Sequence, residues 1–355
     1  MGEIGESFIG LTYKPTDVVS EGGLIVFRSS NIQNGCMDYK DIVRVNKNVK
    51  EKLITKKDDL LVCARNGSAR LIGKNAILHE TDANQTFGAF MMVFRSDKNH
   101  FVHQLLNTRR YSSQVSENLG ARINQITSSD LSSFEFFFPK ENSEMNKIAA
   151  LLDLLDERIA TQNKIIEDLK KLKSAISESL FIDIEGDVVM LSEVCEIIKG
   201  KQINGEFLSE KGKYYVMNGG TEPSGYYSDY NVEANTISIS EGGNSCGYVQ
   251  FNTSPFWSGG HCYTIQNIVR GVDNLYLYHY LKSKEDAIMK LRIGSGLPNI
   301  QKKDLAMFKI KIPPTEKQKT ISTFLSSLER KTEIEEHILN ATQKEKLYLL
   351  QHMFI

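Results

Sequence analysis

The order of apolar and polar residues divides the chain into two kinds of segment. Most of the chain consists of short runs of β-branched and aromatic residues between glycines and asparagines, which predicts strands joined by turns. The clearest runs lie at residues 23–35, 59–69, 88–96, 235–243, 247–251 and 261–269. Residues 101–115 and 274–291 have apolar residues at helical spacing and are predicted to be amphipathic helices. These segments together predict mixed α/β domains.

Residues 142–182 carry apolar residues at heptad spacing instead. Between Ile148 and Leu180, eight of ten heptad positions are apolar, which is the pattern of a coiled coil. Gln162 and Lys173 interrupt the apolar stripe, as polar residues do when they fix the register of two helices.

Residues 315–355 keep the same heptad frame, but Thr332, Glu335, Thr342 and Lys346 weaken its middle. A stripe with this many polar positions favours one particular partner. We therefore predict that this second helix pairs with the helix at 142–182.

The two halves of the chain repeat one another. Residues 130–139 recur at 304–313 with a constant offset of 174, and apolar positions of the following helix recur with an offset of 173. Residues 1–10 align loosely with 191–200 at an offset of 190. A period this long predicts a duplicated domain in a pseudo-twofold arrangement.

The predicted fold class is α+β, with two mixed α/β domains separated by an antiparallel coiled coil of two long helices. The predicted segments are domain one at 1–141, the first helix at 142–182, a linker at 183–190, domain two at 191–314 and the second helix at 315–355.

The junction in the second copy, QKKDLAMFKIKIPPTEKQKTI at 301–321, predicts a strand followed by a helix. Its prolines stop the strand, because proline has no N–H to donate to a sheet. Thr315 is predicted to cap the helix, and Gln318 to complete a capping box. In the first copy Asn142 is predicted to be a simple cap, because Met145 replaces the glutamine.

Composition is that of a soluble globular protein, with 355 residues, 41% hydrophobic and 25% charged. No apolar run has the roughly 18 residues of a membrane-spanning helix, and residues 1–10 lack the pattern of a signal peptide, so we expect a cytoplasmic protein. The net charge of −1 does not indicate nucleic acid, but residues 1–140 carry 18 basic and 15 acidic side chains. This distribution permits DNA binding without predicting it.

Motifs of catalysis and metal binding are scarce. The five cysteines are scattered without a CxxC pair, which predicts free buried thiols, and the neighbours His261 and Cys262 alone are weak support for a metal site. The sequence has no GxxxxGK[ST], GxGxxG or HExxH motif. It also has no DPPY or NPPY motif of amino-methyltransferases. A Ser-His-Asp set stays open, but we predict a chain without catalytic activity.

Several motifs resemble those of one protein family. They are the Pro-x-x-Glu-x-Gln-x-x-Ile-x-x-x-Leu run at 313–325, its echo at 139–152, the helix ends at 180–181 and 353–354, and segments at 27–38, 64–78, 239–251, 255–265 and 294–300. With the duplication, they resemble the DNA specificity subunit of type I restriction–modification systems over essentially the whole chain. One departure is Met1, which falls where family members often carry a short lead sequence.

The resemblance implies a role in DNA recognition. Each domain would read one half of a bipartite site in double-stranded DNA, and the helices would set the unread gap between the halves. The implied partners are two modification (methyltransferase) subunits and the restriction subunits, with no membrane. This chain would hold no cofactor, and the partners would bind S-adenosylmethionine, ATP and magnesium (Mg).

Candidate DNA-binding residues are hydrogen-bonding side chains and turn residues in loops of the two domains. In domain one they are Arg28, Ser30, Asn31, Arg65, Asn66, Ser68, Arg70, Lys74, Arg122, Asn124 and Gln125. In domain two they are Asn218, Gly219, Thr221, Asn244, Ser245, Tyr248, Ser295, Asn299 and Lys302. Phe256 and Trp257 are predicted to belong to the core.

Two alternatives stay open. The chain could be an interaction scaffold whose coiled coil is the active surface, which predicts no sequence-selective DNA binding. It could also serve another class of restriction system, in which methylation and cleavage lie on other chains.

Overall fold

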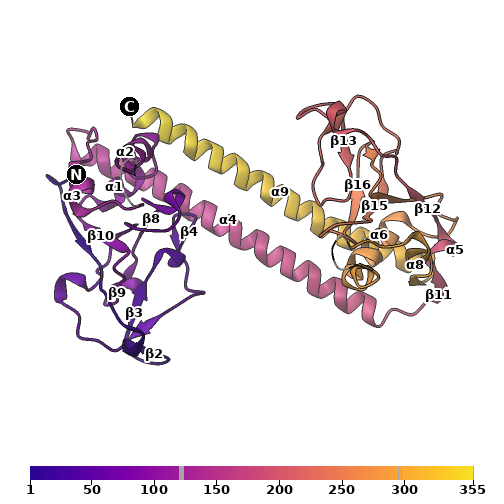
Figure 1. Ribbon diagram of the computed structural model, residues 1–355, viewed down its shortest axis with the longest axis horizontal. Helices are drawn as coiled ribbons and strands as arrows, with labels where there is room; N and C mark the ends of the chain where they lie inside the picture. The colour runs from indigo at the N-terminus through magenta and orange to yellow at the C-terminus, as the bar shows by residue number, and fades with distance from the viewer. Residues whose placement is uncertain (120–123, 295, 297, 355) are drawn as a thin grey trace. The chain divides into compact units, whose positions relative to one another are not determined.

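The structure is a computed structural model that describes residues 1–119, 124–294, 296 and 298–354. It contains two compact units (Figure 1): unit 1 is Met1–Lys164 with His337–Ile355, and unit 2 is Ile165–Glu336. Each unit combines one mixed domain with part of each long helix, α4 (Asn142–Ile182) and α9 (Thr315–Met353).

Unit 1 has a four-stranded antiparallel sheet of order β1-β10-β7-β8 at its centre. The bounds of these strands are β1 Glu6–Ile9, β7 Leu60–Cys63, β8 Asn75–Ile77 and β10 Met91–Arg95. A second sheet has the order β2-β6-β3-β9, and β4 pairs with β5. Their bounds are β2 Val18–Val19, β3 Leu24–Phe27, β4 Ile32–Gln33, β5 Cys36–Met37, β6 Arg44–Val45 and β9 Thr86–Phe87. The helices of the domain are α1 Asn99–Leu105, α2 Arg109–Leu119 and α3 Ser128–Ser133.

The central sheet of unit 1 buries both of its faces. Leu60 and Val62 of β7 pack in a cluster with residues of α1, α2 and α3, whereas Leu61 and Cys63 pack in a second cluster with Phe27 and other residues from the smaller sheets. Side chains alternate between the faces of a strand, so the continuous apolar run of β7 serves two cores. Burying each of these leucines contributes about 2 kcal/mol.

Unit 2 repeats the central sheet with the order β12-β18-β15-β16. The bounds are β12 Glu196–Lys199, β15 Thr236–Ser240, β16 Val249–Asn252 and β18 Cys262–Gln266. Smaller sheets pair β14-β13-β17 and β11-β19, with bounds β11 Asp187–Met190, β13 Tyr214–Met217, β14 Tyr226–Tyr227, β17 Trp257–Ser258 and β19 Lys309–Ile312. The helices are α5 Leu191–Val194, α6 Asn274–Ser283, α7 Glu285–Met289 and α8 Lys302–Ala306.

One face of the unit 2 sheet differs from its counterpart. Ile237 and Ile239 of β15 pack with helix residues in an apolar core. On the other face, the side-chain amide of Asn252 donates to the Ser238 hydroxyl and the Thr236 carbonyl, and all three residues are buried. A buried polar layer of this kind is stable only because its groups are hydrogen-bonded.

Equivalent backbone hydrogen bonds occur within each unit. The Ala64 amide donates to the Phe90 carbonyl in unit 1 and the Glu241 amide to the His261 carbonyl in unit 2, both at 2.9 Å. With the matching sheet orders, they confirm the predicted α+β class and the duplication of one domain.

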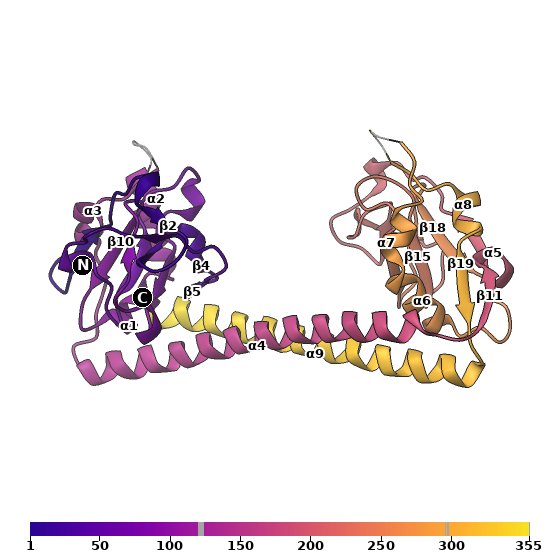
Figure 2. The ribbon, with the colours of Figure 1, turned by 90° about the horizontal axis from the view of Figure 1, so that it is seen from below.

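The long helices run antiparallel within each unit (Figure 2). In unit 1, Lys346 of α9 pairs with Asp156 of α4 at 2.5 Å. In unit 2, Lys173 of α4 pairs with Glu329 of α9, and Lys170 pairs with Glu336. The predicted polar seam positions therefore include two ion-paired lysines.

The hydroxyl-bearing seam positions are also buried. Thr332 and Thr342 donate their hydroxyls back to the carbonyls of Leu328 and Ile338 within α9. Gln162 is 8% exposed. The polar residues in the middle of the stripe thus lie inside the helix contact rather than outside it.

Both predicted amphipathic helices are broken. Residues 101–115 span α1 and α2, and the hydroxyl of Thr108 donates to the Leu105 carbonyl where the first helix ends. Residues 274–291 span α6 and α7, which share Lys284 as a cap residue. A continuous apolar spacing does not register such local breaks.

The junction prediction is wrong in two details. Asp304 and Leu305 belong to the short helix α8, so the strand begins only at Lys309. Gln318 does not complete a capping box: it is buried, donates to the Pro313 and Gly271 carbonyls and accepts from the Asp273 amide. It ties the helix to the domain instead.

The predicted core residues are found mostly as expected. Phe256 is fully buried, and Trp257 is half-buried with its indole N–H donating to the Lys201 carbonyl. Four of the cysteines are free and buried, but Cys36 is exposed, because it lies on the short surface hairpin β4-β5.

Candidate nucleic-acid interface

Three loops of unit 1 meet at one end of the central sheet. The Asn66 backbone N–H donates to the Asn124 carbonyl at 3.3 Å, and the Asn124 side chain donates to the Gly67 carbonyl at 3.0 Å. The side chain of Asn66 donates to the Ser29 hydroxyl at 3.1 Å. Lys74 reaches the Ser29 carbonyl at 3.5 Å. The structure thereby brings together Asn66, Lys74 and Asn124, which the sequence predicted separately.

Arg65 and Gln125 lie in the same loops. They form an isolated antiparallel bridge, and Arg65 is exposed whereas Gln125 is half-buried. Ser68 and Arg70 follow in the next turn and are exposed. This end of the sheet therefore presents amide, hydroxyl and guanidinium groups to solvent.

Phe90 is a residue of this surface that the sequence did not single out. It is 58% exposed, and the guanidinium carbon of Arg65 lies 5.3 Å from the centre of its ring. Its carbonyl accepts from the amides of Ala64 and Arg65, both at 2.9 Å. An exposed aromatic ring on an anchored turn could stack on a base. The only available signal was its place at the start of the apolar run that forms β10.

Arg28, Ser30 and Asn31 contribute mainly to loop structure. Asn31 is 1% exposed, and its side chain donates to the Asp38 and Asp41 carbonyls and accepts from the Arg28 amide. Arg28 pairs with Asp41 at 2.6 Å, and Ser30 is half-buried. Arg122 lies outside the described residues.

The equivalent end of the sheet in unit 2 also gathers predicted residues. Asn299 bridges to Gly242, and the side-chain oxygen of Asn218 accepts from the His261 amide at 3.1 Å. Gly219 adopts a φ of 83°, and an added Cβ would lie 3.1 Å from His261, so a side chain there would be strained and crowded. Gly219 thus shapes the turn that positions Asn218.

A carboxylate lies beneath this surface. Glu241 is 8% exposed, its Oε1 accepts from Lys199 at 2.6 Å and from the Tyr263 hydroxyl at 3.1 Å, and its Oε2 lies 3.6 Å from His261 Nδ1. Burial, with the nearby carboxylate, raises the pKa of Tyr263, so its hydroxyl stays a donor. His261 occupies the position of Phe90, since the two carbonyls accept equivalent backbone hydrogen bonds.

The other predicted residues of unit 2 are spread over neighbouring loops. Asn244 and Ser245 lie in the turn between β15 and β16, and Tyr248 carries the Lys282 ammonium 3.9 Å above its ring. Thr221 and Lys302 are exposed. Ser295 lies outside the described residues. The structure therefore gathers Asn218, Gly219 and Asn299, and the turn with Asn244 begins beside them, since the Gly243 amide donates to the Pro298 carbonyl at 3.0 Å.

No group of three or more His, Cys, Asp or Glu side chains within the described part of the chain is arranged to hold a metal ion. Among the same residues, no helix has the length and apolar character needed to cross a membrane. The side chains at the two sheet ends can form hydrogen bonds, charge interactions and ring-stacking contacts.

Comparison with known proteins decides the family. The chain matches the family described as "Type I restriction modification DNA specificity domain" over residues 1–171 and 184–344. The chain belongs to this family. Specificity subunits of the family are generally non-catalytic.

Two curated specificity subunits illustrate the similarity. The chain is 29% identical over 178 residues to the type I restriction enzyme EcoKI specificity subunit of Escherichia coli K12, and 29% identical over 180 residues to the StySPI specificity subunit of Salmonella potsdam. Each match covers 47% of this chain and 38% of the relative. The chain spans less than half the length of these relatives.

The fold is also that of solved specificity subunits. A crystal structure of the type I restriction–modification system S subunit from Mycoplasma genitalium matches with a TM-score of 0.76, at 20% identity, over 100% of this chain and 94% of the other. A second solved structure, which concerns complex assembly and conformational transition of the type I R-M system, matches with a TM-score of 0.51 at 15% identity, over 98% of this chain and 97% of the other. At such identities the likeness shows the fold shared by the specificity family.

Proposed function

We propose that this chain recognises a bipartite, asymmetric site in double-stranded DNA and acts as the specificity subunit of a type I restriction–modification complex. The observation that carries the proposal is the duplicated domain in a chain of the specificity family. A duplicated reading domain suits a DNA site with two halves.

The chemistry of the two sheet ends supports different half-sites. In unit 1 the surface combines Arg65, Asn66 and Gln125 with the Phe90 ring. Arginine pairs with guanine, and asparagine and glutamine pair with adenine, in the major groove. In unit 2 the equivalent position to Phe90 is His261, beside Asn218. Different side chains at equivalent positions would read different bases, which makes the site asymmetric.

The long helices have two roles in this proposal. Their length would set the unread gap between the half-sites, and their surfaces would bind two modification subunits and, through the assembly, the restriction subunits. One structurally similar chain was solved in the context of complex assembly of a type I system, which supports this role. Those partner subunits would bind S-adenosylmethionine, ATP and magnesium, and this chain would contribute only the recognition of the DNA sequence.

Exchange of one domain tests the proposal. Residues 1–140 are replaced by the corresponding domain of another specificity subunit, and methylated sites are mapped across the genome of cells that contain the matching modification subunits. We expect one half of the methylated sequence to change while the other half and the gap length are kept, because the second domain and both helices are untouched.

Other outcomes have clear meanings. A change in both halves would contradict modular reading by separate domains. If neither the original chain nor the chimera directs methylation to a defined sequence, the chain is an interaction scaffold, and the proposal fails. Deleting the modification subunits is the control, because all site-specific methylation should then disappear.

A further inference from the structure

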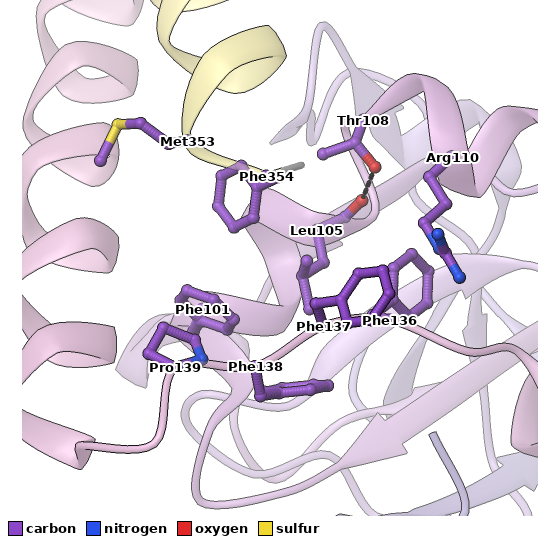
Figure 3. A pocket seen from close by; sticks show the side chains of 10 residues that line it. All are labelled: Phe101, Leu105, Thr108, Arg110, Phe136, Phe137, Phe138, Pro139, Met353 and Phe354. Carbon is purple, nitrogen blue, oxygen red and sulfur yellow. Dashed lines mark hydrogen bonds between the residues drawn. The ribbon is translucent and has the colours of Figure 1, made fainter.

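The junction between the domain and the long helices of unit 1 holds an aromatic cavity of about 170 Å³ (Figure 3). Phe101 and Leu105 of α1, Phe354 beyond the end of α9, and the extended segment at residues 136–138 contribute to its lining. Phe137 is 69% exposed, and the Arg110 guanidinium carbon lies 4.9 Å from its ring centre. This combination of an exposed phenylalanine and an open cavity lined by aromatic side chains calls for an explanation.

Unit 2 shows the same junction in a covered form. The counterpart of residues 135–138 is β19, and β11 pairs with it antiparallel, with Val189 opposite Ile310 and Asp187 opposite Ile312. Ile184 and Val189, from the same segment, pack in the apolar core beside Phe181. An added strand and two apolar side chains therefore close the unit 2 junction.

The correspondence between the junctions is fixed by a hydrogen bond. The Leu191 amide donates to the Phe308 carbonyl at 2.9 Å, and the Met1 nitrogen donates to the Phe134 carbonyl at 2.7 Å. Leu191 directly follows β11. Met1 therefore occupies the place of Leu191, and the counterpart of β11 would lie against residues 135–138.

The edge of that segment in unit 1 has unpaired backbone groups. Within the described residues, neither Phe136 nor Phe138 has a backbone hydrogen bond, whereas Glu135 is bound through Gln114 and Arg110 on the side of the domain. An extended segment with free N–H and C=O groups is a template for a further strand. The apolar clusters at the two junctions differ in the same way. Among the described residues, the unit 1 cluster of Phe101, Leu105 and Phe354 includes none in the roles of Ile184 and Val189.

We propose that residues 135–138 form a docking edge for an extended segment of a partner polypeptide, which adds as an antiparallel strand and closes the aromatic cavity. The segment β11 shows the chemistry of the occupant: a β-branched residue at the place of Val189 and an apolar residue at the place of Ile184. Strand addition of this kind takes affinity from the backbone and selectivity from alternate side chains.

Charge at the rim supports an occupant with acidic flanks. Arg110 is exposed above Phe137, and Lys140 follows Pro139 at the end of the edge. In unit 2 the covering segment is acidic, with Asp183, Glu185 and Asp187 around its apolar residues. A partner segment of similar character would place carboxylates near these two basic side chains.

The test uses a peptide of this chain's own residues 183–190, blocked at both ends and labelled with a fluorophore, added to the full chain. We expect saturable binding of one peptide per chain with a Kd of about 100 µM or tighter, together with slowed hydrogen exchange at the Phe136 and Phe138 amides. No saturation at a peptide concentration of about 1 mM would overturn the proposal.

Backbone-modified peptides test the strand itself. The register and the Leu191 bond place the N–H of Val189 toward β19 and that of Val188 away from it, because pairing alternates along an antiparallel ladder. N-methylation at Val189 should weaken binding about tenfold or more, and N-methylation at Val188, the matched control, about twofold at most. Equal losses from the two modifications would contradict strand addition.

Protein variants locate the site. Phe137→Ala should weaken peptide binding several-fold, because Phe137 would lie opposite Val188. Phe207→Ala should not, because Phe207 is exposed to nearly the same extent (67% against 69%) but lies in unit 2. A variant with residues 183–190 fused in front of Met1 supplies the strand in cis and should no longer bind the peptide. Undiminished binding by the fused variant places the site elsewhere and refutes the proposal. If the chain forms a dimer and the peptide dissociates it, the edge binds a second copy of this chain. That result would refute the proposal of a different partner polypeptide.

Discussion

The two helix–domain junctions are copies of one arrangement with different packing. In unit 2, Phe181 of α4 is 2% exposed and meets the rings of Tyr276 and Tyr280 edge-on at 5.9 and 5.4 Å. In unit 1, Phe354 occupies the matching place, is only half-buried and packs on Phe101 at 5.3 Å. The strand β11 closes the junction of unit 2, whereas the junction of unit 1 borders the aromatic cavity. The two copies therefore share the phenylalanine at the end of the long helix, but within the residues that the structure describes only unit 2 has a strand that covers it.

The ion pairs of the junctions are duplicated as well, with the helices exchanged. Asp156 and Glu329 are 173 residues apart, as are Lys173 and Lys346. In unit 1 the carboxylate comes from α4 and the lysine from α9, and in unit 2 the reverse holds. Polar seam residues therefore pair each helix with the other in one register, which an all-apolar seam would fix less well.

Removing the rings of Phe181 and Phe354 should have the largest effect on stability and should distinguish the two junctions. Phe181→Ala should lower the free energy of unfolding of unit 2 by about 3–5 kcal/mol, because the ring is fully buried and leaves a cavity. Phe354→Ala should lower that of unit 1 by about 1–2 kcal/mol, since its ring is already half-exposed beside a cavity.

Denaturant titration with hydrogen exchange, which reports each unit separately, measures both effects. The far more exposed Phe137→Ala is the control and should change stability by less than about 0.5 kcal/mol. Equal losses for Phe181 and Phe354 would mean that the junction of unit 1 is as tightly packed as that of unit 2, which would contradict the comparison.

Removing the lysines should have smaller and nearly equal effects. Lys346→Met leaves Asp156 with Gln104 at 3.0 Å, and Lys173→Met leaves Glu329 with the Tyr278 hydroxyl at 3.0 Å. Because each carboxylate keeps one partner and each pair is only partly buried, we expect a loss of about 1–2 kcal/mol in either unit.

Thermal and denaturant unfolding of both variants check this equality. Lys171→Met is the matched control, because Lys171 and its partner Glu167 are both exposed on one helix, and such a pair contributes about 0.3–0.5 kcal/mol. A large loss from only one of the two seam lysines would show that the exchanged pairs are not equivalent.

Much of the fold could be predicted because its periodicities are long. The heptads of α4 and the offsets of 173 and 174 persist over many residues, so the two helices and the duplication follow from the sequence. Local events were harder to predict. The break at Thr108 and the burial of Gln318 depend on hydrogen bonds to Leu105 and Gly271, which no spacing of apolar residues encodes.

The candidate interface could be predicted only as residue types in loops. Asn66 and Asn124 meet because the turn after β7 and the segment before α3 lie side by side, a contact across 58 positions. Asn31 has the same residue type as Asn66 but is buried, because its side chain closes a turn through Asp38 and Asp41. Phe90 was missed because an aromatic residue in an apolar run reads as core.

The smallest expected difference between the two junctions lies in the charge of one histidine in each unit, and the pH dependence of stability tests it. His100 in unit 1 lies between Asp153 at 2.6 Å and Asp58 at 3.3 Å, and hydrogen bonding to Asp153 raises the pKa of His100. His279 in unit 2 is buried against the Ser326 hydroxyl at 3.0 Å, and burial lowers its pKa to about 4. On folding, burial destabilises the charged form of His279, whereas hydrogen bonding to Asp153 stabilises that of His100. The stabilisation from His100 is therefore complete below its unfolded pKa of about 6.5 and is lost as pH rises through the higher folded value.

We expect His100→Gln to reduce the free energy of unfolding by a few tenths of a kcal/mol more at pH 5.5 than at pH 8.5, an effect kept small because the pair is half-exposed and screened. His279→Gln should show the opposite dependence: because the folded pKa of His279 lies below its unfolded value, the parent loses stability as pH falls below about 6.5, and the loss on mutation should be larger at pH 8.5 than at pH 5.5. Denaturant titrations of the two variants and the parent at each pH measure the difference. A loss for His100→Gln that is independent of pH, or that grows at high pH, would mean that the histidine is not held protonated by Asp153, and the two junctions would then not differ in charge.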